Sequence, residues 1–281
     1  MSGRLMGMWF KLMVKLVLLL ALVLMAAGAL WFWLAQESLL FKPEALPAST
    51  ALSTASDVFE VSVPVPGATL SALQLKLNNP KGLMFFLHGN GGNLQSWFVN
   101  TDLYRRAGYD LFMLDYRGYG KSTGHIESEA QLRSDVRTAF EQVSAQYAGK
   151  KIVIYGRSLG SGLAAGLSAE LGARPGAVQP DLTVLVSPYS SMLAMANDHY
   201  PIIPSGLIRY PLRTDALVGK IRSPLLLFHG DQDRLISPLH SASLKALAPK
   251  AELVLVAGAA HNDLHTFAAY REKFVAALER L

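Results

Sequence analysis

The sequence has no cysteine among its 281 residues. This absence excludes disulfides, thiolate zinc sites and a cysteine nucleophile, and it leaves the redox compartment undecided. Charge is also scarce, because charged residues make up 17% of the chain and the formal net charge is +5. Three of the positive charges, Arg4, Lys11 and Lys15, lie in the first fifteen residues, and no dense Lys/Arg stripe follows them. We therefore expect no nucleic-acid partner.

Apolar residues are abundant, at 51% of the chain, and one run of them is long enough to cross a bilayer. Residues 16–35 are twenty consecutive residues without a charge, which corresponds to about 30 Å of helix. Basic residues precede this run, and Trp31 and Trp33 stand near its far end, where indole rings favour the headgroup zone. The pattern predicts a single transmembrane anchor.

The charge asymmetry predicts the orientation of that anchor. Residues 1–15 are expected in the cytoplasm, and the rest of the chain on the opposite side, which is the periplasm in a Gram-negative bacterium. A cleaved signal peptide is the alternative, because small residues occur at positions 26–29. The apolar run is longer than a signal peptide needs, and the tryptophans follow the small residues, so a retained anchor is favoured.

The chain beyond the apolar run divides into a linker and a domain. Residues 36–57 mix Pro, Ser, Thr and Ala without a sustained period, which indicates a linker. The domain, residues 58–281, begins with two alternating runs at 58–65 and 69–77. These runs predict an antiparallel pair of strands joined by the Pro-Gly turn at 66–67.

Six short, continuously apolar runs follow, and such runs are typical of strands that are covered on both faces. Segments of helix length separate most of them. The order predicts an α/β fold with one doubly wound, mostly parallel sheet of about eight strands and helices on both faces. Residues 188–223 break this alternation, and we expect them to form a small cap insert. The runs are residues 83–87, 111–114, 151–156, 182–187, 224–230 and 252–258, and the expected helices span residues 128–147, 159–171, 238–247 and 261–281.

Ser158 is the candidate nucleophile. It stands in the sequence Gly156-Arg157-Ser158-Leu159-Gly160, which fits Gly-x-Ser-x-Gly and lies directly between a predicted strand and a predicted helix. A sharp strand-to-helix turn strains the serine backbone and crowds the neighbouring chain, which explains the two glycines. The alternative is that Ser158 merely caps the helix.

A serine hydroxyl needs a base, and the base needs an orienting acceptor. His261 follows the last predicted strand through a loop of small residues, at the sheet edge expected to hold the nucleophile, and is the candidate base. Asp231 and Asp233 both follow the strand at 224–230. We expect Asp233 to be the acceptor and Asp231 to shape the turn.

The sequence His-Gly-Asn-Gly-Gly-Asn at residues 88–93 follows another predicted strand. A glycine-rich turn there can direct backbone N–H groups at a developing oxyanion, so we expect the N–H groups of Asn90 and Leu159 to form the oxyanion hole. A phosphate-binding loop is the alternative, but no Gly-Lys-Ser/Thr follows. Neither a metal nor an organic cofactor is implied. His261 and His265 have a metal-ligand spacing without an acidic third ligand, so a solvated His265 on a helix is favoured.

These motifs, in this order and spacing, resemble the α/β-hydrolase superfamily over residues 58–281. They look most like its small-cap, membrane-anchored serine hydrolases, which include protein depalmitoylases and lysophospholipid or monoacylglycerol lipases. The resemblance implies a Ser158-Asp233-His261 triad, and it leaves Asp115 and Arg117 in a structural turn. The segments that carry it are HGNGGN (88–93), DYRGYGKS (115–122), GRSLGS (156–161), SPYSSM (187–192), HGDQDRLIS (229–237) and AGAAHNDL (257–264).

The sequence therefore predicts a membrane-anchored serine hydrolase that cleaves a small acyl ester or thioester through an acyl-enzyme, with lipid-like substrates favoured. A peptidase or amidase with the same triad is one alternative, and a catalytically silent binding protein is another. The apolar residues of the cap are expected either to line an acyl pocket or simply to pack the cap. They are Met192, Met195, Tyr200, Ile202, Ile203, Leu207, Ile208 and Tyr210.

Overall fold

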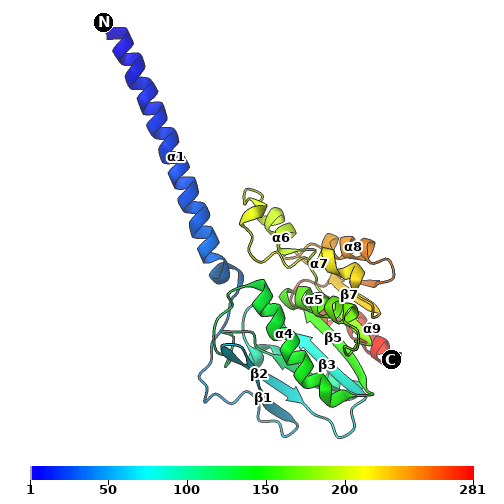
Figure 1. The fold of residues 1–281 in the computed structure, drawn as a ribbon. Coiled ribbons are helices and arrows are strands. Elements are labelled where there is room, and N and C mark those ends of the chain that lie inside the picture. The colour runs from blue at the N-terminus through cyan, green and yellow to red at the C-terminus, as the bar shows by residue number, and fades with distance from the viewer. Residues whose placement is uncertain (1) are drawn as a thin grey trace.

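An eight-stranded sheet runs through the domain, with the strands in the order β1-β2-β4-β3-β5-β6-β7-β8 (Figure 1). β1 pairs with β2 and β2 with β4 in the antiparallel sense, and all other neighbours are parallel. The predicted α/β architecture is thereby confirmed. The strands are β1 (Val58–Val65), β2 (Ala68–Leu75), β3 (Gly82–Leu87), β4 (Tyr109–Leu114), β5 (Lys151–Arg157), β6 (Leu182–Val186), β7 (Leu225–Gly230) and β8 (Glu252–Val256).

This computed structural model describes the backbone of residues 2–281 and the side chains of residues 6–281. Met1 and the charge of Arg4, which belong to the predicted cytoplasmic terminus, lie outside the described residues. The helices are α1 (Ser2–Leu40), α2 (Leu94–Trp97), α3 (Asp102–Ala107), α4 (Glu129–Ser144), α5 (Leu159–Ala173), α6 (Met192–His199), α7 (Thr214–Leu217), α8 (Pro238–Leu247) and α9 (Ala268–Glu279).

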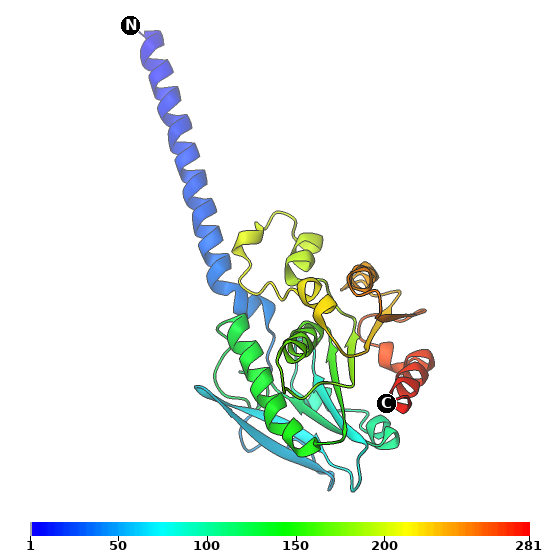
Figure 2. The same ribbon diagram turned by 45° about the vertical axis from the view of Figure 1, so that its right-hand side comes forward.

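Helices cover both faces of the sheet (Figure 2). One hydrophobic cluster joins α4, α5 and α8 to one face, and a second cluster joins α3 and α9 to the other. Alternate residues of β3 serve the two clusters, because Phe85 packs in the first while Met84 and Phe86 pack in the second. Successive side chains of a strand point to opposite faces, so a strand buried on both faces is apolar at every position.

The helices differ from those predicted in two places near the site. The last helix begins at Ala268 rather than at residue 261, so His261 lies in a loop that also contains the 3-10 turn Leu264–Thr266. The structure also has α2 and α3 between β3 and β4, where no helix was named among those predicted. These helices are too short to show a helical period in the sequence.

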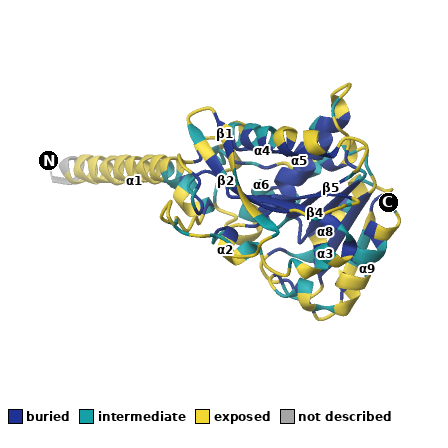
Figure 3. Cartoon of the chain, turned by 90° about the horizontal axis from the view of Figure 1, so that it is seen from below, coloured by how far each residue is buried: buried dark blue, intermediate teal, exposed yellow. Residues whose placement is uncertain are grey.

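Helix α1 projects from the domain, and Figure 3 shows that most of it is exposed. Residues 6–40 form a helix that is long and apolar enough to cross a membrane. Its most apolar part is not buried against the rest of the chain. A signal sequence near the N-terminus would meet the same criteria. The helix continues past the predicted end at Ala35 as far as Leu40.

The segment predicted as a linker, residues 36–57, begins inside α1 and contacts the domain. Gln36 Nε2 donates a hydrogen bond of 2.6 Å to Leu207 O, in the cap. Phe41, the first residue after the helix, is only 4% exposed and packs in the larger hydrophobic cluster. The last turn of α1 and the residues that follow it are therefore packed against the domain.

Candidate active site

Ser158 lies in the sharp turn between β5 and α5, with φ at +52° and ψ at −120°. A positive φ is uncommon for a residue with a Cβ atom and indicates backbone strain. The flanking glycines make the turn possible, because a Cβ on Gly156 would overlap Gly160 O and a Cβ on Gly160 would overlap Leu87 O. Ser158 therefore sits at the carboxyl end of a central strand, where the Gly-x-Ser-x-Gly pattern leads us to expect it.

Two side chains from later loops form a hydrogen-bonded series with Ser158. His261 Nε2 lies 3.0 Å from Ser158 Oγ, and His261 Nδ1 lies 2.7 Å from Asp233 Oδ2. Both distances are within hydrogen-bond range. His261 and Asp233 are 9% and 5% exposed, respectively. The structure thus brings together the three residues that the sequence analysis singled out as nucleophile, base and acid.

Asp233 is held by more partners than His261 alone. Its Oδ1 accepts hydrogen bonds from the N–H groups of Leu235 at 3.0 Å and Ile236 at 2.9 Å. Burial raises its pKa, but hydrogen bonds from His229 and His261 outweigh burial and hold the pKa of Asp233 well below its usual value. Asp233 is therefore a carboxylate at neutral pH, which is the form that can stabilise an imidazolium.

Asp231, the other candidate acid, has a different set of contacts. It is exposed, and its Oδ1 accepts a hydrogen bond of 2.8 Å from the N–H group of Gly258. The next residue, Gln232, donates its N–H group to Ala259 O at 2.9 Å. These bonds join the turn after β7 to the loop that leads to His261, so Asp231 acts on the shape of the turn.

Two further residues, for which no role was predicted, contact His261 or Asp233. His229 Nε2 lies 2.9 Å from Ile236 O and 3.3 Å from Asp233 Oδ2, and its Nδ1 lies 2.6 Å from Ser241 Oγ. Arg157, next to Ser158, donates from Nη2 to His261 O at 3.1 Å. The sequence His-Gly-Asp-Gln-Asp carries a signal for His229, because a histidine and an aspartate four residues apart flank one tight turn.

The loop at residues 88–93 approaches Ser158 closely. A Cβ on Gly89 would lie 3.3 Å from Ser158 Cβ and 2.7 Å from the ring of Trp97. Within the described part of the chain, the N–H groups of Asn90 and Leu159 donate to no protein acceptor. Asn90 follows Gly89 in the chain and Leu159 follows Ser158, so both unpaired donors belong to residues next to this close approach, as the predicted oxyanion hole needs.

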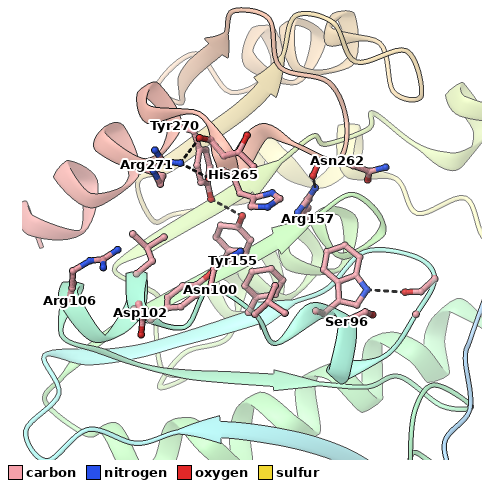
Figure 4. A pocket seen from close by; sticks show the side chains of 18 residues that line it. Ser96, Asn100, Asp102, Arg106, Tyr155, Arg157, Asn262, His265, Tyr270 and Arg271 are labelled. Carbon is pink, nitrogen blue, oxygen red and sulfur yellow. Dashed lines mark hydrogen bonds between the residues drawn. The ribbon is translucent and has the colours of Figure 1, made fainter. Parts of the chain in front are cut away.

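A cavity of about 740 Å³ has Arg157, the residue before Ser158, in its wall (Figure 4). Trp97 also lines this cavity. Tyr155 and Tyr270 also line it, and their hydroxyl groups are 2.8 Å apart. A second hollow, of about 440 Å³, has His261 in its wall. Ligand sites for small molecules have volumes of this order.

His265 lies in the wall of the larger cavity (Figure 4) rather than on a solvated helix face. It belongs to the 3-10 turn Leu264–Thr266, and its Nδ1 is buried without a hydrogen-bond partner in the described structure. Burial and, after it, the charge of Arg157 lower the pKa of His265. Among the side chains of residues 6–281, no three His, Asp or Glu residues form a group that could hold a metal ion.

The cap, residues 188–223, does not present one continuous apolar lining. Met192 and Met195 pack against the larger hydrophobic cluster and Tyr210 is fully buried. Tyr200 and Ile202, in contrast, are 63% and 91% exposed. Met192, Met195 and Tyr210 therefore pack the cap, which is the second of the two expectations, whereas Tyr200 and Ile202 are too exposed to do so.

A second cluster of serine, histidine and aspartate lies between the cap and α8. His240 Nε2 lies 2.9 Å from Asp198 Oδ2, and His240 Nδ1 lies 2.9 Å from Ser190 Oγ. His240 Nδ1 also accepts the backbone N–H group of Ser190 at 3.2 Å. The side chain of Asp198 is 48% exposed. The sequence analysis gave no role to these three residues.

Known proteins match this chain at the level of sequence. A family model described as serine aminopeptidase, S33, matches residues 78–209. The alpha/beta hydrolase domain-containing protein aho-3 of Caenorhabditis elegans is 29% identical over 213 residues, covering 70% of this chain and 57% of that protein. The chain thus spans little more than half the length of this relative. An uncharacterized protein of Mycobacterium tuberculosis is 30% identical over 260 residues, or 85% of each chain.

Solved structures give the same assignment for the fold. The esterase Pf2001 of Pyrococcus furiosus superposes with a TM-score of 0.65 at 18% identity, over 85% of this chain and 97% of that chain. At such low identity the likeness concerns the arrangement of helices and strands, and one fold of this kind serves many reactions. From the sequence matches and the sheet order together, we conclude that the chain belongs to the α/β-hydrolase superfamily.

Proposed function

We propose that the chain is a membrane-anchored serine hydrolase that cleaves carboxylic esters or thioesters. The observation that carries this proposal is the hydrogen-bonded series from Ser158 Oγ through His261 to Asp233, with distances of 3.0 and 2.7 Å. In this proposal Ser158 is the nucleophile, His261 is the general base and Asp233 keeps His261 in the working tautomer. The strained backbone of Ser158 supports the assignment, because strain of this kind concentrates at functional sites.

The proposed reaction begins when Ser158 Oγ attacks the carbonyl carbon and its proton passes to His261 Nε2. The carbonyl oxygen becomes an oxyanion, which accepts hydrogen bonds from the N–H groups of Asn90 and Leu159. The tetrahedral intermediate then expels the alcohol or thiol, which takes the proton from His261 and leaves an acyl-enzyme. Water attacks the acyl-enzyme with His261 as base again, and Ser158 recovers its proton.

The larger cavity, whose lining includes Arg157 but none of Ser158, Asp233 and His261, would suit an acyl substrate with both polar and apolar parts. The larger cavity has the apolar side chains of Phe86, Trp97 and Leu103 and the charged side chains of Arg106 and Arg157 in its lining. The fold neighbour Pf2001 is described as an esterase, which is consistent with ester chemistry. A peptidase is the second candidate, because the matching family model is described as a serine aminopeptidase.

Helix α1 is proposed to anchor the protein, with residues 16–35 in the bilayer and residues 1–15 in the cytoplasm. The apolar surface of α1 outside the domain supports an anchor. Lys11 and Lys15 precede the most apolar part and Trp31 and Trp33 lie at its far end, which supports placing residues 58–281 on the opposite side of the membrane, the periplasmic side in a Gram-negative bacterium.

Labelling with a fluorophosphonate tests the nucleophile. The reagent phosphonylates an activated serine, so the purified full chain in detergent should carry one label, mapped by peptide mass spectrometry to Ser158. Ser190→Ala should label like wild type and Ser158→Ala should not label. A label that persists undiminished in Ser158→Ala would overturn the assignment. Turnover of a matched ester and amide with the same acyl group then separates an esterase from a peptidase.

A single engineered thiol tests the topology. The chain has no cysteine, and Ser49 is exposed after the end of α1. We expect the Ser49→Cys variant to react with a membrane-impermeant maleimide once the reagent reaches the non-cytoplasmic face. A thiol that reacts only after the cytoplasmic membrane is breached would reverse the orientation. A soluble product with a new N-terminus would replace the anchor by a cleaved signal peptide.

A further inference from the structure

The residues that leave α1 lie directly against the loop proposed to hold the oxyanion. Pro43 forms a parallel β-bridge with Gly92, and Ala45 forms another with Gly120. The N–H group of Glu44 donates to Gly92 O at 3.3 Å. We call residues 40–46 the strap, because they connect the helix to the domain and run across this loop.

Asn90 joins the strap through its side chain. Its Nδ2 donates to Leu40 O at 2.6 Å, and its Oδ1 accepts the N–H group of Lys42 at 3.0 Å. The hydroxyl group of Tyr119 donates to the same Oδ1 at 2.8 Å and accepts the N–H group of Lys42 at 3.2 Å. The N–H group of Gly91 also donates to Asn90 Oδ1, at 3.0 Å. The side-chain amide thus binds the strap on one side and its own loop on the other.

A neighbouring side chain makes a similar connection. Asn93 Nδ2 donates to Glu44 O at 3.0 Å, and the N–H group of Gly120 donates to the same carbonyl oxygen at 3.0 Å. Leu46 closes the arrangement by donating its N–H group to Gly120 O at 2.7 Å. The strap is therefore hydrogen-bonded along its length, from Leu40 to Leu46.

The loop needs such support because it contains two glycines with positive φ. Gly91 and Gly92 have φ values of +80° and +71°, and glycine is the residue with the largest choice of backbone conformations. A backbone N–H group stabilises an oxyanion only when it is already positioned at hydrogen-bond distance from the place where the charge develops. In the unsupported loop, the N–H group of Asn90 would sample orientations that do not meet this condition.

From these contacts we infer that the strap is part of the active site and that the side chain of Asn90 is a positioning residue. Its amide group fixes the loop to the residues leaving α1, so that its own backbone N–H group is held ready for the oxyanion. The inference rests on the proposed function, because it needs an oxyanion at Ser158. It goes further by giving the end of an apolar helix a part in the chemical step.

The test replaces the side chain and keeps the backbone donor. In the full chain in detergent, Asn90→Ala should lower kcat for a soluble acyl ester by about 10-fold to 100-fold, below the 10²- to 10³-fold cost of removing an oxyanion donor outright. KM should stay within about twofold of wild type, because the lost interaction belongs to the transition state. The pH dependence of kcat should keep its shape, because the Ser158-His261-Asp233 contacts are untouched.

Gln95→Ala is the matched control. Gln95 also has an amide side chain that contacts the residues following α1. Its Nε2 donates a hydrogen bond of 3.3 Å to Ala51 O. It lies outside the strap and the loop at 88–93, so its loss should leave kcat within twofold of wild type. A second variant, Tyr119→Phe, removes one of the three donors to Asn90 Oδ1 and should lower kcat by only a few fold.

The outcomes separate this inference from the proposed function. If Ser158→Ala abolishes turnover while Asn90→Ala keeps the kcat of wild type, the inference fails and the proposed function stands. If Ser158→Ala keeps turnover, the proposed function fails first. Equal losses in Asn90→Ala and Gln95→Ala would also overturn the inference, because a general loosening of the N-terminal segment would then explain both. Thermal unfolding midpoints show whether each variant is folded under the assay conditions.

Discussion

Among the side chains of residues 6–281, one cluster of serine, histidine and aspartate contains Ser158 and another contains Ser190. In both, the histidine has one ring nitrogen near a carboxylate and the other near a serine hydroxyl, at distances of 2.7 to 3.0 Å. The surroundings differ. Ser158 has a strained backbone at the start of a helix, with φ at +52°, whereas Ser190 donates its own backbone N–H group to His240 Nδ1 at 3.2 Å.

Similar distances between side chains therefore do not by themselves identify a nucleophile. The nitrogen of His240 that faces Ser190 already accepts a backbone hydrogen bond, so its lone pair is not available for the hydroxyl proton. Asp198 is also half-exposed, whereas Asp233 is buried and accepts two backbone N–H groups. The Ser190 cluster therefore joins the cap to α8, and we propose the Ser158 cluster as the site of reaction.

The largest expected effect comes from removing each serine in turn. Ser158→Ala should lower kcat for an acyl ester by up to about 10⁶-fold, as expected when a member of such a unit is lost. Ser190→Ala should change kcat by less than twofold. Steady-state assays of the two purified variants give the comparison directly. A comparable loss in both would mean that the cluster at the cap takes part in catalysis.

Replacing the carboxylates should give the next largest difference. Asp233→Asn should lower kcat by about 10⁴-fold, because an amide favours the wrong tautomer of the histidine. Asp198→Asn removes the corresponding charge beside His240 and should leave kcat within twofold of wild type. The assay is the same as for the serine variants. Loss of activity in Asp198→Asn with full activity in Asp233→Asn would reverse the assignment of the two clusters.

Acid should destabilise the wild-type protein more than the Asp233→Asn variant, because only the wild type carries the buried and paired carboxylate. Partners hold the pKa of Asp233 low in the folded protein, while an unfolded aspartate titrates near pH 3.9. The carboxylate therefore stabilises the fold above about pH 4, and this stabilisation is lost as the pH falls further. Urea unfolding of wild type should show a steeper fall in stability below about pH 4 than Asp233→Asn. Parallel curves would contradict this prediction.

The smallest effect is expected from the half-exposed partner in the second cluster. Asp198→Ala should lower the free energy of unfolding by no more than about 0.5 kcal/mol, because solvent competes for the half-exposed carboxylate and weakens its contact with His240. Denaturant unfolding with a matched wild-type control measures this difference. A loss several times larger would show that the link between α6 and α8 holds the cap in place.

The sequence predicted the parts of the site that depend on local pattern and chain order. Ser158 was recognisable because the turn between β5 and α5 requires glycines at both flanks. His261 and Asp233 were recognisable because parallel strands bring the loops at their carboxyl ends to one edge of the sheet. The eight strands could be predicted from two alternating runs and six apolar runs, because a strand that is covered on both faces is apolar at every position.

The remaining features depend on contacts between distant residues. Leu40 and Asn90 are fifty positions apart and meet only in the folded chain, so no local period indicates their hydrogen bond. His229 is an exception, because it lies only four positions before Asp233 and its 3.3 Å contact follows from the tight turn between them. Residues 36–57 resemble a linker in composition, and composition does not show that Phe41 is buried in the core.

The junction between α1 and the cap also limits how the enzyme can move. Arg209 contacts the end of α1 at four points. Its Nη1 lies 2.7 Å from Glu37 Oε1 and donates to Trp33 O at 3.2 Å, its guanidinium lies 5.4 Å from the ring of Trp33, and its backbone N–H group donates to Gln36 Oε1 at 2.7 Å. Figures 1 and 2 show the helix leaving the domain next to this part of the cap. These contacts restrict rotation of the domain about the end of α1. In the proposed membrane-anchored hydrolase, the domain would therefore keep one tilt to the bilayer surface and would meet its substrate by lateral diffusion in two dimensions.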